Sequence, residues 1–390
     1  MKIFYLTPRV PYPIDKGDKL RAFYQIKYLS AEHEIFLFAI DENDVFNPND
    51  NPLIQHCKGI QVAKLSRLKI LYNLIRGIFR SIPFQTSYYY SSKTAKEICK
   101  AIEDFKPDLI FCQLIRTGKF VENIPNIPKI IDYVDVISKG LERRLEKSNL
   151  FLRFLLKWEL KRAVKYEEVI FRKFNERIII TNEDRDLLPF KEKFEVKVIP
   201  NGIDLEFFYP IESHKKCDIL FSGNLSYPPN INAADYLVNE IMPVVWKNNP
   251  NVNVNIAGAA PKKRVLSLAS EKVKIIGWTD DIRENYKVAK IFIAPLQIGT
   301  GLQNKLLQAM AMKLPCVVSE LTAKGITNKN CDFMLVAKTP EDYSNHINKL
   351  LKDKEYSDSI AERGYTFVKN NFDWKKIIND LDEIVKNTCI

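Results

Sequence analysis

Short apolar runs alternate along the chain with longer segments whose apolar residues recur at helical spacing. Parallel strands need a crossover connection, so this alternation is typical of a parallel sheet covered by helices. In the first half the pattern predicts strands at Lys2–Leu6, Ile35–Ala39, Leu109–Cys112, Lys129–Asp132 and Arg177–Thr181. It predicts helices at Lys19–Ser30, Lys64–Ile82, Ala95–Phe105, Leu141–Phe174 and Asn182–Leu188.

The second half repeats the same rhythm. Its predicted strands are Asp218–Ser222, Val252–Ala257, Val273–Ile276, Ile291–Ala294 and Cys316–Ser319. Its predicted helices are Asn232–Asn248, Lys262–Ser270, Ile282–Lys287, Gln303–Met312, Pro340–Asp353 and Tyr365–Ile390. The fold class is therefore α/β, with two doubly wound parallel sheets. We expect them to face each other across a cleft at the carboxyl ends of their strands, where ligands bind in such sheets.

The length of 390 residues also favours two domains, because a single hydrophobic core rarely grows beyond about 250–300 residues. The switch between the halves falls in the loop Ile199–Pro210, which is rich in turn-forming residues. We expect a first domain at residues 1–203 and a second at 204–370. The remaining residues, 371–390, would form a helix that crosses back to the first domain.

Composition excludes several classes of protein. Hydrophobic residues make up 46% and charged residues 27% of the chain, which is ordinary for a globular protein and excludes disordered, collagenous and disulfide-stapled ones. The seven cysteines are scattered without metal-binding spacing, which indicates reduced thiols. No apolar stretch approaches the roughly 20 residues that span a bilayer, and the start MKIFYLTPRVPYP favours a strand over a signal peptide. We expect a cytoplasmic protein.

The net charge of +11 is concentrated in residues 51–100, which hold nine Lys or Arg and one Glu. Within them, the predicted helix Lys64–Ile82 has one apolar face and places Lys69, Arg76 and Arg80 roughly opposite. Two interpretations remain open: peripheral contact with an anionic membrane at the inner face of the plasma membrane, or a core-packed helix with a solvated basic face. We do not expect nucleic acid as a partner, because no recognition motif accompanies the charge.

The segment Ile291–Glu320 carries the strongest indication of a binding site. A buried strand leads into a loop with Gly299, Thr300 and Gly301, and a helix begins near Leu302–Gln303. Glycines let the backbone approach a ligand closely, and the free amides at a helix N-terminus suit a diphosphate. In the first helical turn Lys305 adds a full positive charge. Gln308 follows one turn later on the same side.

Several segments together resemble the family 4 glycosyltransferases of GT-B architecture, which have two Rossmann-like domains. In the second half these are FSGNLSYPPNINAADYL, a strand ending in IAG, IIGWTDDIRENYKVAKIFIAPL and GTGLQNKLLQAMAMKLPCVVS, preceded by the hinge-like VIPNGIDLEFFYP. In the first half they are YLTPRVPYPIDKGDKLRAFYQIKYLS and IIDYVDVIS. The resemblance covers nearly the whole chain and is nearest to a branch of sugar transferases associated with bacterial exopolysaccharide and exosortase clusters.

The resemblance implies an enzyme of the hexosyltransferase type, which transfers a sugar from a nucleotide-sugar to a lipid-linked or polysaccharide acceptor with retention of configuration. It implies Lys305 and Asp135 as catalytic residues. The implied donor-binding residues are Gly223, Asn224, Trp278, Thr279, Gly299, Thr300, Gly301, Leu302, Gln303 and Gln308. A loop near the acceptor and the diphosphate would contain Lys16, Gly17, Asp18 and Arg21.

Two departures from the family pattern keep other functions open. Gln308 stands where the family has a Glu that grips the ribose, and SGNLSYPPN lacks the family's Arg and Lys. A nucleotide-sugar-binding protein with little turnover and a sugar-nucleotide epimerase or hydrolase of the same architecture are the alternatives. A dehydrogenase is disfavoured because no GxGxxG follows the first strand.

The same residues also carry structural alternatives. Asp135 is either a sugar-facing carboxylate or a buried cap at a strand end, and Lys16–Lys19 is either a site loop or a solvated turn with Asp18 as helix cap. No Asp-x-Asp lies between a predicted strand and helix. We therefore expect no metal and no cofactor.

Overall fold

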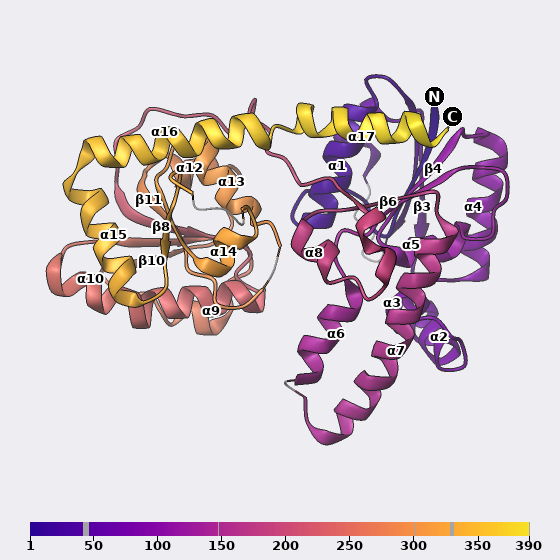
Figure 1. Ribbon diagram of the computed structural model, residues 1–390, viewed down its shortest axis with the longest axis horizontal. Helices are drawn as coiled ribbons and strands as arrows, with labels where there is room; N and C mark the ends of the chain where they lie inside the picture. Colours follow the sequence, from indigo (N-terminus) through magenta and orange to yellow (C-terminus); the bar gives the residue numbers. More distant parts are fainter. Residues whose placement is uncertain (42–46, 147, 300, 328–330, 390) are drawn as a thin grey trace. The chain divides into compact units, whose positions relative to one another are not determined.

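A computed structural model describes residues 1–41, 47–146, 148–299, 301–327 and 331–389. The chain divides into two compact units (Figure 1). Unit 1 comprises Met1–Pro200 and Ile377–Ile390, and unit 2 comprises Asn201–Lys376. Each unit is built around a parallel sheet, which confirms the predicted α/β class with two parallel sheets.

Unit 1 contains a seven-stranded sheet in the order β3-β2-β1-β4-β5-β6-β7. Every neighbouring pair is parallel, with Ile3 paired to Ile35 on one side of β1 and to Leu109 on the other. The central strands are buried on both faces, as expected where helices cover a parallel sheet. Their bounds are β1 Lys2–Thr7, β2 Glu34–Asp41, β3 Gly59–Lys64, β4 Leu109–Gln113, β5 Lys129–Asp132, β6 Glu176–Ile179 and β7 Lys197–Val198.

The connections of unit 1 hold eight α-helices within the described residues. Their bounds are α1 Gly17–Leu29, α2 Arg67–Ile78, α3 Phe84–Tyr89, α4 Ser92–Phe105, α5 Ile115–Val121, α6 Ile137–Glu146, α7 Leu150–Lys173 and α8 Asn182–Asp186. Three short 3-10 helices accompany them at Pro48–Asp50, Pro52–His56 and Lys191–Glu195. The helix α17, Trp374–Thr388, also contributes to this unit, where Asp382 binds His33 Nε2 at 2.5 Å.

Unit 2 contains a six-stranded parallel sheet in the order β10-β9-β8-β11-β12-β13. In Figure 1 the helices α9 and α10 lie on one side of this sheet, and α13 and α16 lie on the other. The strand bounds are β8 Cys217–Ser222, β9 Val254–Ala257, β10 Val273–Ile276, β11 Ala289–Ala294, β12 Cys316–Ser319 and β13 Leu335–Ala337. The helix bounds are α9 Pro228–Tyr236, a π-helical turn Leu237–Ile241, α10 Met242–Asn248, α11 Lys263–Leu266, α12 Arg283–Lys287, α13 Asn304–Ala311, α14 Glu320–Lys324, α15 Pro340–Lys352 and α16 Lys354–Asn371.

The prediction of one long helix at Leu141–Phe174 is wrong. The chain forms α6 and then begins α7 anew, because the Asn149 side chain caps α7 by accepting a hydrogen bond from the Leu152 amide at 3.0 Å. Likewise Tyr365–Ile390 is divided between α16 and α17. The break falls at Phe372, and Asp373 accepts the Lys375 amide at 3.0 Å at the start of the next helix.

The apolar side of α2 is not packed into the core. Leu65 and Ile82, which flank the helix, are buried, but six large apolar side chains between them are exposed: Leu68, Leu71, Tyr72, Ile75, Ile78 and Phe79. The interpretation as a core-packed helix is therefore wrong. No helix in the described part of the chain is both long and apolar enough to cross a membrane.

Candidate active site

The strand order of unit 2 reverses between β8 and β11, and this is where ligands bind in doubly wound sheets. Gly223 follows β8, whereas Gly299 and Gly301 follow β11 and lead into α13. Both loop glycines have positive φ, 112° and 82°. Thr300, the third predicted residue of this loop, lies outside the described residues.

The turns after β8 and β9 approach each other so closely that residue 258 has no room for a side chain. A Cβ at Gly258 would lie 1.8 Å from the Gly223 carbonyl oxygen, and both residues have positive φ (148° and 153°). A Cβ at Gly223 would in turn lie 2.8 Å from Lys305 Nζ. The predicted Gly223 is thus part of a crowded backbone surface directly beside the predicted Lys305.

Lys305 lies in the first turn of α13, and its ammonium group turns towards the end of β8. Nζ donates a hydrogen bond to Asn230 Oδ1 and lies 5.0 Å from the centre of the Phe221 ring. The Asn230 amide is itself oriented, because its Nδ2 donates to the Asn224 carbonyl at 2.9 Å. Burial lowers the Lys305 pKa from its ordinary value to about 7. Within the described residues no carboxylate forms an ion pair with Lys305.

Gln308, one turn further along α13, is held by a buried tyrosine. The Tyr286 hydroxyl donates to Gln308 Oε1 at 2.9 Å and lies 2.8 Å from Ser222 Oγ at the end of β8. Tyr286 has no exposed surface. This hydroxyl therefore connects α13 to β8 and fixes the orientation of the Gln308 amide.

The other predicted donor-binding residues lie around the same edge of the sheet. Trp278, two residues after β10, is 66% exposed, and Thr279 accepts a hydrogen bond from Asn285 Nδ2 at 3.1 Å. Gln303 is the residue before α13, and its Nε2 donates to the Gly301 carbonyl at 3.2 Å. Leu302 packs partly against the core of unit 2. Asn224 uses its Oδ1 to accept the Ser226 amide at 2.9 Å.

In unit 1 the strand order reverses between β1 and β4, and α1 follows the loop after β1. Lys16 occupies the N-cap position and Gly17 is the first helical residue, with open space around its α-carbon. Asp18 is not the helix cap. Its carboxylate pairs with Arg9, and its carbonyl accepts Gln113 Nε2 from the end of β4 at 2.7 Å.

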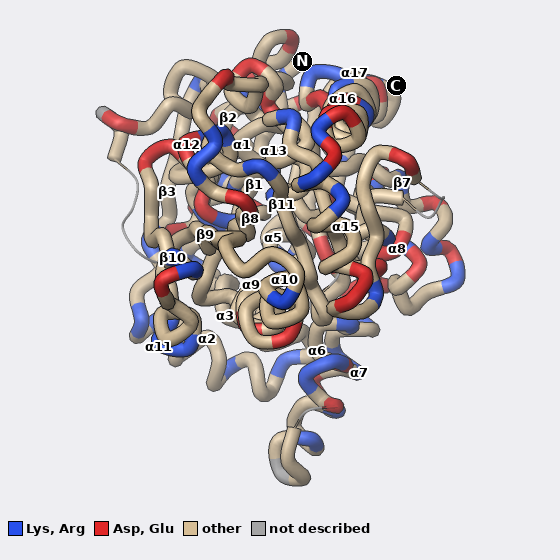
Figure 2. The backbone as a smooth tube through the Cα atoms, turned by 90° about the vertical axis from the view of Figure 1, so that its left-hand side faces the viewer, with Lys and Arg blue, Asp and Glu red and all other residues tan. Residues whose placement is uncertain are grey.

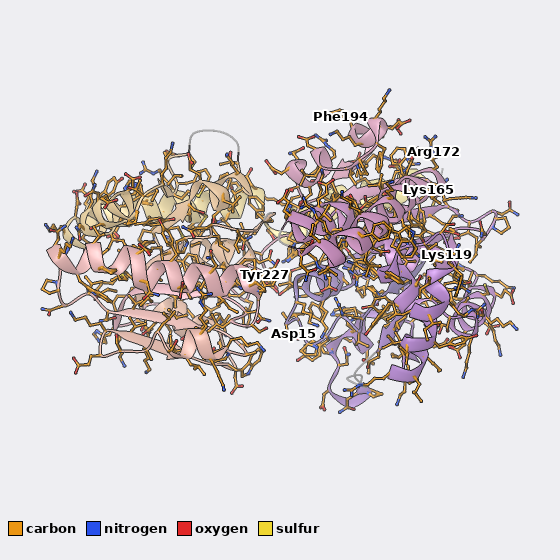
Figure 3. The ribbon with its side chains drawn as sticks, turned by 90° about the horizontal axis from the view of Figure 1, so that it is seen from below. Asp15, Lys119, Lys165, Arg172, Phe194 and Tyr227 are labelled. Carbon is orange, nitrogen blue, oxygen red and sulfur yellow. The ribbon has the colours of Figure 1, made fainter. Side chains whose placement is uncertain are left out.

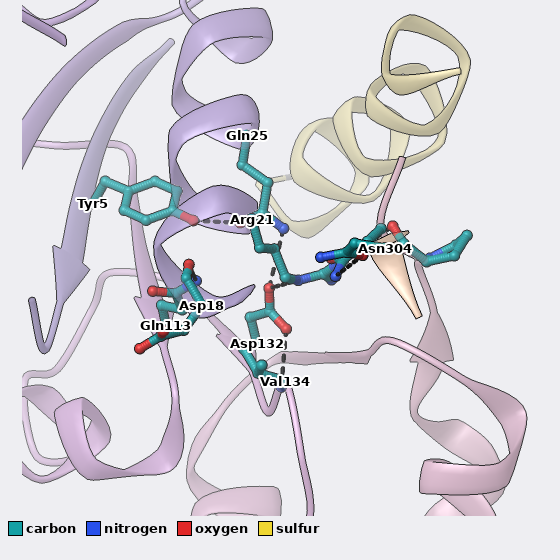
Figure 4. Close-up of polar contacts among 10 residues, drawn as sticks. Tyr5, Asp18, Arg21, Gln25, Gln113, Asp132, Val134 and Asn304 are labelled. Atoms are coloured by element: carbon teal, nitrogen blue, oxygen red, sulfur yellow. Dashed lines mark hydrogen bonds and ion pairs between the residues drawn. The ribbon is translucent and has the colours of Figure 1, made fainter. Parts of the chain in front are cut away.

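Arg21 faces the interior of unit 1 instead of the loop surface. Its Nε lies 2.5 Å from Asp132 Oδ2 at the end of β5, and neither side chain is exposed (Figure 4). Gln25 Nε2 donates to the same carboxylate oxygen at 3.0 Å, and the Tyr5 hydroxyl donates to Gln25. Arg21 is thus part of a buried network that supports the loops.

Asp135 lies three residues beyond β5, in a turn with a strained backbone. Val134, which is β-branched, has φ of 63°, a rare conformation for such a residue, and its amide donates to Asp132 Oδ1 at 3.2 Å. The Asp135 side chain is open to solvent, so the interpretation as a buried cap is wrong. Nevertheless, the surrounding protein displaces enough water to raise its pKa to about 6, an effect that Arg116 partly opposes.

Four residues with a defining role in these arrangements were not predicted: Asn230, Tyr286, Asp132 and Gln25. Asn230 lies in the segment SGNLSYPPN, where only the absence of Arg and Lys was noted. The other three occupy positions whose sequence pattern indicates only core packing. Among the described residues no group of three or more His, Cys, Asp or Glu is arranged to hold a metal ion.

The arrangement in unit 2 is suited to an anionic ligand. The N-terminus of α13 presents free amides, and Lys305 adds a cation in the first turn of the same helix. A Lys whose pKa is near 7 becomes more fully charged when a phosphate approaches, because the negative charge favours the ammonium form.

The chain is similar to several known proteins. The family described as glycosyl transferases group 1 matches residues 216–353. An uncharacterised 44.6 kDa protein from the cps region of Klebsiella pneumoniae is 23% identical, over 97% of this chain and 98% of that protein. The Escherichia coli UDP-Gal:alpha-D-GlcNAc-diphosphoundecaprenol alpha-1,3-galactosyltransferase is 26% identical, over 50% of this chain and 56% of the enzyme.

Among solved structures, Anabaena Alr3699/HepE in complex with UDP-glucose superposes with a TM-score of 0.71 at 15% identity, over 99% of this chain and 100% of that one. This likeness shows the fold, which is GT-B. Unit 2 therefore contains a region that is similar to the glycosyl transferases of group 1, and the whole chain has the GT-B fold.

Proposed function

We propose that the protein is a glycosyltransferase of group 1 that moves a hexose from a UDP-sugar to a lipid-linked acceptor during polysaccharide synthesis, with retention of configuration and without a metal ion. The observation that carries the proposal is the position of Lys305 beside the glycine turns of unit 2. The UDP-glucose complex of the Anabaena protein and the UDP-Gal donor of the Escherichia coli enzyme support the uracil base.

In the proposed donor site, the amides of Gly301–Gln303 and the start of α13 bind the diphosphate. Lys305 stabilises the negative charge that develops on the leaving phosphate as the glycosidic bond breaks. Gln308 binds the ribose hydroxyls with a neutral amide that Tyr286 orients. Trp278, which is exposed at the same edge of the sheet, and Thr279 border the base.

We assign unit 2 to the donor and unit 1 to the acceptor. Asp135 faces the transferred sugar as a carboxylate, since a group with a pKa of about 6 is mostly ionised at neutral pH. A carboxylate there stabilises the positive charge that develops on the sugar ring in the transition state. Lys16, Gly17 and Asp18, at the start of α1, approach the acceptor, and Arg21 supports this segment from within.

The proposed location is the inner face of the plasma membrane. The cps-region relative supports a role in polysaccharide synthesis, and the diphosphoundecaprenol acceptor of the Escherichia coli enzyme supports a lipid-linked acceptor. The exposed apolar side chains of α2 and its basic residues Lys69, Arg76 and Arg80 are suited to peripheral contact with an anionic membrane. The finer assignment, to the exosortase-associated branch, rests on sequence resemblance alone.

A thermal-shift panel of UDP-, GDP-, ADP- and dTDP-sugars tests the donor assignment. A ligand that binds only the folded protein raises its stability by RT ln(1 + [L]/Kd). We expect UDP-sugars to raise the melting temperature of the wild type, and to raise that of Lys305→Ala much less. A response to another base class, or an equal response of Lys305→Ala, would contradict the proposed site.

One observation favours a second candidate, a nucleotide-sugar-binding protein with little turnover. Gln308 carries no charge, and its amide oxygen already accepts a hydrogen bond from Tyr286. A product assay separates the candidates. Transfer that requires an acceptor supports the proposed enzyme, conversion of the donor alone indicates an epimerase or hydrolase, and binding without any product indicates the second candidate.

A further inference from the structure

Unit 1 has a surface pocket that no part of the proposed reaction uses. The pocket has a volume of about 380 Å³ and lies where the C-terminal end of α2 meets α7. Phe79 and Trp158 contribute aromatic walls, and the cations Arg80, Lys161 and Lys165 line it together with the hydroxyl-bearing Ser81. Lys165 is labelled in Figure 3.

A buried arginine builds the floor of this pocket. Arg162 Nη2 donates to the carbonyls of Gly77 at 2.5 Å and Arg80 at 2.7 Å, and Nη1 lies 3.2 Å from Glu159. The ion pair neutralises the charge of Glu159, and the two carbonyl contacts connect the end of α2 to α7. The pocket is therefore a fixed feature of unit 1, and the Arg162 cation is already used to form it.

The cations at the rim of the pocket have no carboxylate partner in the described part of the chain, and the Arg80 guanidinium lies 5.1 Å from the centre of the Tyr90 ring. No ion pair involves Arg80, Lys161 or Lys165 within the part of the chain that the structure describes. Lys161 and Lys165 also belong to a row of exposed cations at spacing of four residues along α7, which consists of Arg153, Lys157, Lys161 and Lys165. Figure 2 shows separate Lys and Arg segments along α7, between stretches of other residues.

Exposed apolar side chains flank the same cations on both helices. On α2 and the residue that follows it, Leu68 is 81% and Phe79 is 87% exposed, and on α7 Leu150 is 86% and Phe154 is 81% exposed. Figure 1 shows α2 and the α6–α7 hairpin projecting from the same side of unit 1. A surface that combines large exposed apolar side chains with surrounding basic residues is typical of proteins that bind at the interface of an anionic bilayer.

We propose that α2 and residues 150–165 of α7 form one membrane-docking face, and that the pocket between them binds the phosphate of an anionic phospholipid. This inference rests on the proposed function, because it places the enzyme where a lipid-linked acceptor is held. The three rim cations complement the phosphate, and the apolar side chains contact the acyl region. A nucleic acid would neutralise the cations but would leave the exposed Leu and Phe side chains in water.

Vesicle flotation with purified full-length protein tests the docking face. The probes are vesicles of phosphatidylcholine alone and of phosphatidylcholine mixed with phosphatidylglycerol. We expect binding to the anionic vesicles only, and a loss of at least about tenfold in Lys161→Glu/Lys165→Glu, because each basic residue near an anionic surface contributes roughly a fivefold factor. The matched control is Lys96→Glu/Lys100→Glu, which reverses two exposed cations at the same spacing on α4.

The two charge-reversal variants distinguish binding at the pocket from general electrostatic attraction of the protein to anionic vesicles. An equal loss of vesicle binding in both charge-reversal variants would contradict the proposal that the pocket binds lipid. Unchanged binding of Lys161→Glu/Lys165→Glu would contradict it too. Phe79→Ser/Phe154→Ser should lose binding while it keeps every cation, and full retention would overturn the docking face. Binding to single-stranded RNA in place of the vesicles would also overturn the proposal.

The same proteins, measured without vesicles in the UDP-sugar thermal-shift panel, keep the two proposals distinguishable. A variant that loses vesicle binding but keeps its nucleotide response supports the docking face. A wild type that responds to UDP-sugars and does not float contradicts the docking face alone. A wild type that floats but responds to no nucleotide contradicts the proposed function alone.

Discussion

Arg21 Nε lies 2.5 Å from Asp132 Oδ2, and both side chains are fully shielded from solvent. The ion pair joins α1, whose first turn belongs to the proposed acceptor segment, to the end of β5, which leads to Asp135. It therefore fixes two chain segments of unit 1 that are 111 residues apart in sequence. Because the pair is buried, it can support the two loops from inside unit 1.

Removing one partner of this pair should be strongly destabilising. Asp132→Asn leaves the Arg21 guanidinium buried without its counter-ion, and we expect a loss of about 3–5 kcal/mol in the free energy of unfolding, measured in urea. The double variant Arg21→Met/Asp132→Leu should recover much of this loss because it buries no charge. A cost below about 1 kcal/mol for Asp132→Asn would show that the pair does not hold the loops.

Lys305→Ala should reduce turnover by about 10²–10³-fold, the usual effect of removing one preorganised group that stabilises developing negative charge. The melting temperature of the free protein should not fall, because burial already disfavours the Lys305 ammonium group. Steady-state kinetics and thermal unfolding measure the two effects. Lys263→Ala, at an exposed position of α11, is the control. Turnover close to that of the control would remove Lys305 from the mechanism.

Binding of UDP should be accompanied by proton uptake at Lys305. With a pKa of about 7, the free amine is only about one-tenth protonated at pH 8, and a neighbouring diphosphate restores its charge. Calorimetric titration at pH 8 in two buffers of different ionisation enthalpy should show uptake approaching one proton. Uptake should decline towards pH 6, where the amine is already charged, and should be absent in Lys305→Met. Equal uptake in that variant would assign the proton to another group.

Gln308→Glu should strengthen binding of the nucleotide by about three- to tenfold, because a charge-assisted hydrogen bond to the ribose is roughly twice as strong as a neutral one. Calorimetry with UDP measures the change. Tyr286→Phe removes the hydroxyl that holds this side chain and should reduce the gain when the two substitutions are combined. If both effects are simply additive, Tyr286 does not orient residue 308.

The sheets are largely predictable because most of their strands are short and mainly apolar. Lys129–Asp132, Val273–Ile276 and Cys316–Ser319 are strands at the predicted bounds. The strands that were missed lie at or near sheet edges, where burial is weaker. In β3, Gly59–Lys64, only one residue is fully buried, and β13 is three residues long. Local pattern carries little signal for such strands.

Two further features depend on packing that local sequence does not record. The amide of Asn230 reaches Lys305 across 75 residues of chain, and Asp132 meets Arg21 across 111. The apolar residues of α2 would have the same spacing whether they packed into a core or lay at the surface. In the structure they lie at the surface. The sequence therefore predicts the loops of the proposed site, but not the side chains that support them.

Because of Glu167, the free energy of unfolding should fall as the pH rises. This carboxyl is fully buried on α7, where Oε1 accepts the Ser138 amide at 3.0 Å, and burial raises its pKa to about 7 from the ordinary 4.5. The folded state therefore holds a proton that the unfolded state has released, so the stabilisation is complete below about pH 4.5 and is lost as the pH rises through 7.

The loss attributable to Glu167 between pH 5 and pH 8 should reach up to about 3 kcal/mol in the free energy of unfolding. Glu167→Gln, which keeps the acceptor and cannot ionise, should lack this component. Urea unfolding of both proteins at the two pH values isolates it, because all other titrating groups are shared. The variant should therefore gain stability relative to the wild type at pH 8 compared with pH 5. A difference between the two proteins that does not change with pH would show that Glu167 keeps an ordinary pKa in the folded state.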